Sequence, residues 1–157
     1  MSPQIDTLEL SVNANTVTQA IAWLETISNR ESWSSELRFS LTISIDEALT
    51  NIVSYAFENT PFMGGDDRMK TPAMPYKIFI SCFCFPTKIQ IKIIDNGKPY
   101  DPTKSIAPPL AESIDNAKIG GIGLRLMHHY LSDIFYYFEN HQNHLILNKE
   151  TLNNTHC

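Results

Sequence analysis

A glutamate and an asparagine stand four residues apart in one apolar stretch, SIDEALTNIVSYAF, residues 44–57. Side chains four apart project from the same side of an α-helix, so Glu47 and Asn51 would lie side by side and could reach one ligand. A carboxylate beside a hydroxyl can act as a general base, and an amide oxygen can occupy one position on Mg²⁺. Taken alone, however, the pair is more simply the surface of a helix.

An aspartate ends the alternating segment KIQIKIID, residues 88–95, and is followed by Asn96 and Gly97. Asp-Asn-Gly is common turn chemistry, and a plain turn is the simpler interpretation of these three residues alone. A partly buried carboxylate at a strand end has a second use, because it can accept a hydrogen bond from an exocyclic amine. Such a bond would select adenine over guanine.

Glycines gather in GGIGL, residues 120–124, at the start of a segment that is expected to be helical. Glycine allows the backbone to approach a ligand closely. The free N–H groups and the dipole at a helix N-terminus favour phosphate. The alternative is a flexible hinge before a helix, and the glycines by themselves do not decide between the two.

The elements that must position these residues follow from hydrophobic periodicity. Alternation predicts strands, and 3.6-residue spacing with a serine cap predicts helices. The order β, α, α, β, β, loop, α, β, β, with short turns between neighbouring strands, predicts a mostly antiparallel sheet with helices on one face, an α+β two-layer sandwich. The expected strands are 5–12, 76–85, 88–95, 133–140 and 144–149; the expected helices are 15–30, one from within 32–36 through Phe57, and 122–131. The apolar face of the second helix is expected to be Ile43, Leu49, Ile52, Val53 and Ala56, and residues 59–75 are expected to form an exposed loop.

Length and composition narrow the class of protein. The chain has 157 residues, 43% hydrophobic and 18% charged, which suits a single globular domain. Its net charge of -5 argues against nucleic-acid binding, which needs a basic face. The most apolar run, 78–85, is far shorter than the roughly 20 residues of a membrane span, and the N-terminus lacks a secretory pattern. We therefore expect a cytoplasmic protein with no membrane contact.

Taken together and in order, the three stretches resemble the ATP-binding boxes of the GHKL superfamily. The asparagine box would be EALTN, residues 47–51, the first glycine box DNGKPYDP, 95–102, and the second GGIGLRLM, 120–127. The first glycine box, the short lid and the chain length look most like the bacterial anti-sigma-factor serine kinases. The likeness spans about 5–149, within one domain of 1–157.

The resemblance implies a Bergerat fold that binds ATP and Mg²⁺. It assigns Glu47 as the general base, Asn51 as the nucleotide contact that ligates Mg²⁺, and Asp95 as the reader of adenine. It also implies that Gly97 lets the chain pass close to the base. The phosphate lid would comprise Gly120, Gly121, Gly123 and Leu124.

The activity implied is transfer of the γ-phosphate of ATP to a serine of an anti-anti-sigma antagonist of the STAS type, by a protein that also sequesters a sigma factor and can form a homodimer. Two alternatives remain: a non-catalytic ATP-binding regulator that switches partners, and a detached histidine-kinase ATPase domain. Glu47 favours the kinase, because a pure binder needs no base. Ser54 and Tyr55 depart from the family, which has a basic residue and then histidine there, so a polar contact near the phosphates would be missing.

Overall fold

The computed structural model describes residues 2–57, 75–104 and 121–151 of the chain. Its regular elements lie close to the predicted bounds. They are β1 (Gln4–Ser11), α1 (Thr16–Arg30), α2 (Ser35–Asn51), the π-helical turn η1 (Ile52–Ala56), β2 (Lys77–Phe85), β3 (Lys88–Asp95), the 3₁₀ turn η3 (Pro102–Lys104), α3 (Gly121–Tyr130), β4 (Asp133–Glu139) and β5 (Gln142–Glu150). None of the helices in this part of the chain combines the length and the apolar character needed to cross a membrane. The loop expected within 59–75 lies almost wholly outside the described residues.

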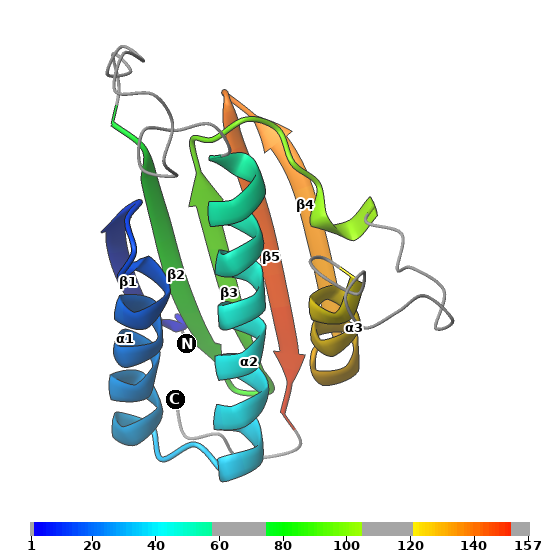
Figure 1. Ribbon diagram of the computed structural model, residues 1–157. Helices are drawn as coiled ribbons and strands as arrows, with labels where there is room; N and C mark the ends of the chain where they lie inside the picture. The colour runs from blue at the N-terminus through cyan, green and yellow to red at the C-terminus, as the bar shows by residue number, and fades with distance from the viewer. Residues whose placement is uncertain (1, 58–74, 105–120, 152–157) are drawn as a thin grey trace.

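The strands form one antiparallel sheet in the order β1-β2-β3-β5-β4, and α1, α2 and α3 all cover the same face of it (Figure 1). The predicted α+β sandwich is therefore confirmed. After β3 the chain passes to the sheet edge as β4 and returns as β5 between β3 and β4. This crossover places the end of β3 beside the start of β5, with Asp95 paired to Asn143.

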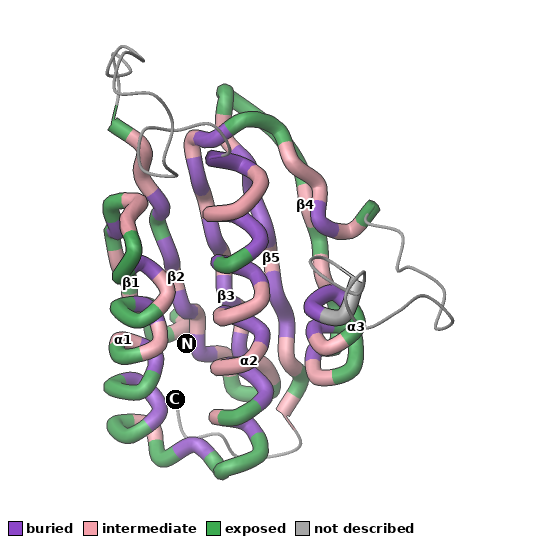
Figure 2. The backbone as a smooth tube through the Cα atoms, in the orientation of Figure 1, coloured by how far each residue is buried: buried purple, intermediate pink, exposed green. Residues whose placement is uncertain are grey.

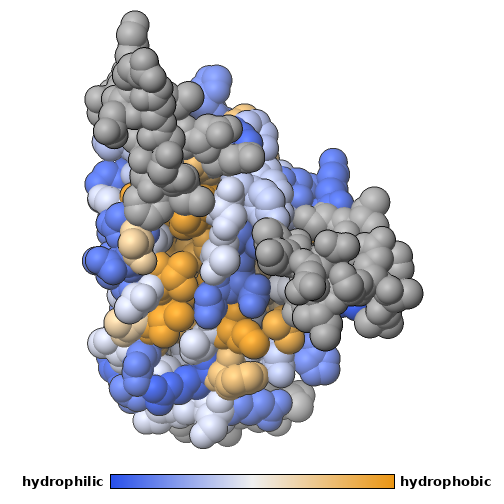
Figure 3. All heavy atoms as spheres, in the orientation of Figure 1, coloured by the Kyte–Doolittle hydropathy of each residue, from blue (hydrophilic) through white to orange (hydrophobic). Residues whose placement is uncertain are grey.

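Strict alternation explains why β2 and β3 are buried on one face only. In β3, Ile89, Ile91 and Ile93 are fully buried and point toward the helices, whereas Lys88 and Lys92 are half-buried on the other face. Figure 2 shows the burial concentrated where the helices meet the sheet. Hydrophobic residues are also visible between α1 and α2 in the space-filling view (Figure 3). From α1, Val17, Ile21 and Trp23 are partly buried and pack against the core.

Helix α2 crosses the middle of the sheet and carries the predicted Glu47 and Asn51. It begins at the cap Ser34, whose side chain accepts a hydrogen bond from the N–H of Leu37 at 3.1 Å. Its buried stripe includes Leu41, Ile45, Ala48 and Leu49, and Ile52 continues the stripe into η1. Of the predicted apolar face, Leu49, Ile52 and Ala56 are buried, and Val53 is half-buried and packs against the core. Ile43 is half-buried and is not part of this core cluster. The spacing of Leu41, Ile45 and Ala48 turns this stripe toward the sheet and Ile43 away from it.

The end of α2 differs from the uninterrupted helix expected through Phe57. After Asn51 the chain forms the π-helical turn η1. Wide turns of this kind are rare and occur often at functional sites. The carbonyl oxygen of Ala56, the last residue of η1, accepts a hydrogen bond from the N–H of Lys98 at 2.9 Å. The end of the helix is thereby joined to the segment that follows β3.

Candidate nucleotide site

Asp95 lies at the end of β3 with only 2% of its surface exposed. Its Oδ1 atom accepts two hydrogen bonds, from the N–H of Gly97 at 2.9 Å and from Nδ2 of Asn143 at 2.9 Å. Both bonds end on one oxygen, so a ligand that donates a hydrogen bond could use Oδ2. Burial raises the pKa of Asp95 to about 6, although the hydrogen bonds from Asn143 and Gly97 lower it. At neutral pH the group is therefore mainly an ionised acceptor.

Asn143 was not among the predicted site residues, yet it is the hydrogen-bonding partner of Asp95. It is 3% exposed and sits at the start of β5, directly opposite Asp95 in the sheet. The predicted strand began one residue later, at His144, and so left Asn143 out. A signal was present in the sequence: Asn143 occupies the inward phase of the alternation continued by Leu145 and Leu147, where a polar residue needs a partner.

Gly97 is required by a contact with the protein itself. A Cβ atom built on it would lie 2.6 Å from the carbonyl oxygen of Ala56 and 2.8 Å from the Ala56 Cβ. Only glycine lets the segment after β3 pass this close to η1. The expected role of Gly97 beside an adenine base stays a prediction.

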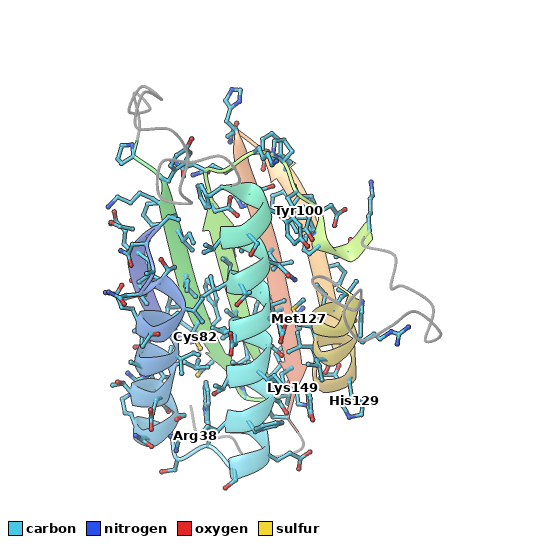
Figure 4. The ribbon with its side chains drawn as sticks, in the orientation of Figure 1. Arg38, Cys82, Tyr100, Met127, His129 and Lys149 are labelled. Carbon is cyan, nitrogen blue, oxygen red and sulfur yellow. The ribbon has the colours of Figure 1, made fainter. Side chains whose placement is uncertain are left out.

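Two tyrosines connect the same segment to the end of α2. Tyr100, labelled in Figure 4, lies between β3 and η3, and its ring stacks on that of Tyr55 in η1 with centroids 4.8 Å apart and planes at 15°. Tyr55 is one of the two positions at which the sequence departs from the family pattern. In this structure it therefore contributes an aromatic contact with the first glycine box.

Glu47 and Asn51 occupy the last two turns of α2, but their surroundings differ. Asn51 is 5% exposed and Glu47 is half-buried, so the simpler interpretation as a solvent-facing pair does not describe Asn51. The pKa of Glu47 is raised, mainly by burial and also by the negative charge of Asp46. A raised pKa brings a carboxylate closer to the range in which it can take up a proton during a reaction.

The second glycine box meets the asparagine box through Gly123. A Cβ atom on Gly123 would collide with Oε2 of Glu47, which places the Glu47 carboxylate against the first turns of α3. Gly121 is the first residue of α3, so the glycines do open a helix as predicted. Leu124 is buried in the hydrophobic core, and Gly120 lies outside the described residues.

These groups fit the chemistry of ATP with Mg²⁺. Asn51 supplies an amide oxygen suited to Mg²⁺, and a bound nucleotide would supply phosphate oxygens for further ligand positions. The described part of the chain has no group of three or more His, Cys, Asp or Glu side chains that could hold a metal by itself.

The class of protein follows from fold and site together: a one-sided antiparallel sandwich with a buried carboxylate at a strand end and a glycine-initiated helix is a GHKL-type domain. Comparison with known proteins makes this specific. Residues 10–149 match the family described as the histidine kinase-like ATPase domain, and the chain belongs to that family.

Several protein kinases are similar to the chain over most of its length. The serine/threonine-protein kinase BtrW of Bordetella bronchiseptica is 46% identical over 147 residues, which cover 94% of each chain. The serine-protein kinase RsbW of Listeria monocytogenes is 28% identical over 137 residues, 85% of this chain and 79% of the relative. RsbW of Listeria innocua is 27% identical over the same lengths.

Proposed function

We propose that this protein is an ATP-dependent serine kinase that phosphorylates an anti-anti-sigma antagonist and sequesters a sigma factor. The names of two relatives support the kinase activity. BtrW, a serine/threonine-protein kinase, is 46% identical over 94% of both chains, and RsbW is a serine-protein kinase. The antagonist, the sigma factor and a cytoplasmic location are inferred from the resemblance to anti-sigma-factor kinases. A homodimer is part of the same proposal.

The observation that carries the proposal is the state of Asp95. It is a buried carboxylate with one oxygen fixed by two donors, and in this proposal the other oxygen accepts from the ligand. A buried carboxylate is costly unless it has a partner that matches it. The exocyclic amine of adenine is a donor and would match Oδ2, whereas the oxygen of guanine at that position would repel it.

The remaining groups supply what phosphoryl transfer needs, which is mainly positioning and neutralisation of charge. Glu47 would accept the proton of the serine hydroxyl as the serine oxygen bonds to the γ-phosphorus and the bond to the ADP oxygen breaks. Asn51 would hold Mg²⁺, which would neutralise phosphate charge. The first turn of α3, beginning at Gly121, would present backbone N–H groups to the phosphate oxygens.

The test combines binding with transfer. Isothermal titration should show binding of ATP that depends on Mg²⁺, and incubation with ATP, Mg²⁺ and the STAS-type protein of the same genome should place phosphate on one serine, located by mass spectrometry. ATP binding without transfer would favour the non-catalytic regulator. Absence of ATP binding would refute the nucleotide site altogether.

A further inference from the structure

One amide side chain joins the carboxylate at the end of β3 to the segment that follows it. Nδ2 of Asn143 donates to Oδ1 of Asp95 at 2.9 Å and to the carbonyl oxygen of Lys98 at 2.9 Å. Its Oδ1 accepts the N–H of Tyr100 at 3.0 Å and the hydroxyl of Tyr136. The two N–H groups and the oxygen of this amide are thus all used.

The partners of Asn143 permit only one orientation of its amide group. The backbone N–H of Tyr100 can only donate, so it must face the oxygen. The carbonyl of Lys98 and the ionised carboxylate of Asp95 can only accept, so they must face the NH₂ group. An amide held on both sides in this way is fixed before any ligand arrives.

We propose that Asn143 is a positioning residue for nucleotide recognition, which aims the Asp95 carboxylate at the base and holds residues 97–100 in the conformation that stacks Tyr100 on Tyr55. This inference rests on the proposed binding of ATP. Asn143 itself need not touch the nucleotide. It acts by holding Oδ1 of Asp95, so that Oδ2 remains the acceptor for a ligand.

The effect of Asn143 reaches the helix that carries the other candidate residues. By fixing the N–H of Tyr100, it sets the place of a ring that lies 4.8 Å from the ring of Tyr55. Tyr55 belongs to η1, which directly follows Asn51 at the end of α2. A change at the start of β5 is therefore expected to disturb both the strand end and the helix end of the site.

Ionisation of Asp95 gives the proposal a readout that packing alone would not change. The hydrogen bond from Asn143 is the largest influence that lowers the pKa of Asp95, against the burial that raises it. Without that bond the carboxyl group would hold its proton at higher pH and could no longer accept freely from an amine. The group facing it from β2 is Ile78, its partner in the sheet, and η1 contributes the backbone of Ala56 beside Gly97.

The titratable group near Asp95 on β4 is Tyr136. Its pKa is raised first by burial, and the negative charges of Asp101 and Asp95 raise it further. Tyr136 is therefore a neutral hydroxyl donor throughout the neutral range, and its hydrogen bond to Asn143 does not titrate there. A shift in the pH dependence of binding can then be traced to Asp95.

The experiment compares Asn143→Leu with Asn148→Leu. Asn148 lies on the same strand, is 6% exposed, and accepts a hydrogen bond from Gln90 at 2.9 Å. It belongs to the opposite phase of β5, on the sheet face without helices. Asn143→Leu should raise the Kd for ATP about 10- to 100-fold and weaken the preference for ATP over GTP, because a hydrogen bond to a charged group is lost. Asn148→Leu should leave both unchanged.

The pH dependence separates positioning from simple structural support. Binding by the wild type should weaken as pH falls through about 6, where Asp95 protonates, and Asn143→Leu should move this midpoint upward. The phosphates of ATP titrate equally in both experiments, so the difference belongs to the protein. A structural role alone would lower the melting temperature and leave the midpoint and the base preference unchanged, which would overturn the proposal.

A second variant covers the case in which Asn143→Leu does not fold. Tyr136→Phe keeps the ring and removes only the hydroxyl that helps to orient the amide, and it should raise the Kd for ATP severalfold. An unchanged Kd and pH midpoint in Tyr136→Phe would then overturn the proposal. If the wild type binds ATP but neither variant differs from it, only this inference fails; if the wild type does not bind ATP, the proposed function fails as well.

Discussion

The two ends of the candidate site, the strand end at Asp95 and the helix face at Glu47, are built in different ways. Asp95 is fixed by the register of the sheet and by two hydrogen bonds to one oxygen. Glu47 is placed by helical spacing and by its fit against Gly123. In the proposed function the strand end would serve recognition, which needs a fixed acceptor. The helix face would serve chemistry, which needs a carboxylate that can take up a proton.

Glu47→Gln should have the largest effect on phosphoryl transfer. Removing a general base is expected to lower the rate of serine phosphorylation about 10²- to 10⁴-fold, while the Kd for ATP changes little because the amide keeps the shape of the side chain. Single-turnover kinetics with saturating ATP would measure the rate. Glu36→Gln, the same substitution at an exposed position in the first turn of α2, is the matched control. Equal effects of the two substitutions would remove Glu47 from the role of base.

Asp95→Asn should affect binding rather than chemistry. The amide can still accept from Gly97 and Asn143, but it would present an NH₂ group to the amine of adenine, and the Kd for ATP should rise about 100-fold. Titration calorimetry with ATP and GTP would measure this change. Asp133→Asn, at the exposed first residue of β4, is the control and should bind ATP like the wild type. ATP binding retained by Asp95→Asn would break the assignment of this end to recognition.

The burial of Asp95 should also be visible in stability. The pKa of Asp95 is about 6 in the folded protein, against 3.8 for an ordinary aspartate. Between these two pH values the folded state therefore keeps a proton on Asp95 that the unfolded state has lost. Protonation of Asp95 therefore adds about 2–3 kcal/mol to the free energy of unfolding. This stabilisation is complete below about pH 4 and is lost as the pH rises through about 6. Urea unfolding from pH 4 to pH 8 should show this loss in the wild type and not in Asp95→Asn. Parallel pH curves for the two proteins would contradict it.

The placement of Glu47 and Asn51 on one helix could be predicted from the sequence. At the strand end only the placement of Asp95 could be predicted, and not its hydrogen-bonding partner. Glu47 and Asn51 could be paired because helical spacing is local, and Asp95 could be found because it ends a clear alternation. Asn143 could not be paired with Asp95, since the two are 48 residues apart and only the crossover of β4 and β5 brings them together. The π-helical turn after Asn51 was missed because hydrophobic periodicity continues through it.

Gly97 borders the strand end of the site and Gly123 borders the helix face, so substitutions at these two glycines test the two ends separately. At Gly97 a new Cβ atom would meet the backbone oxygen of Ala56, which cannot move without displacing η1. Gly97→Ala should therefore lower the free energy of unfolding by about 2 kcal/mol, measured by urea unfolding. Lys104→Ala, at an exposed position after the same segment, should change it little. A fully stable Gly97→Ala would mean that the strand end is less rigid than its hydrogen bonds indicate.

At Gly123 the obstructing atom is the far end of the flexible Glu47 side chain. Gly123→Ala should therefore leave stability almost unchanged, since alanine also favours the helix. The Glu47 carboxylate must move, and the rate of phosphorylation should fall about tenfold through loss of alignment. His128→Ala, at an exposed position of α3, is the control. In a Glu47→Gln background Gly123→Ala should have no further effect on the rate, because both changes act through the same carboxylate. An additive loss would instead place the effect of Gly123 in the backbone of α3, and the helix face would then be as rigidly built as the strand end.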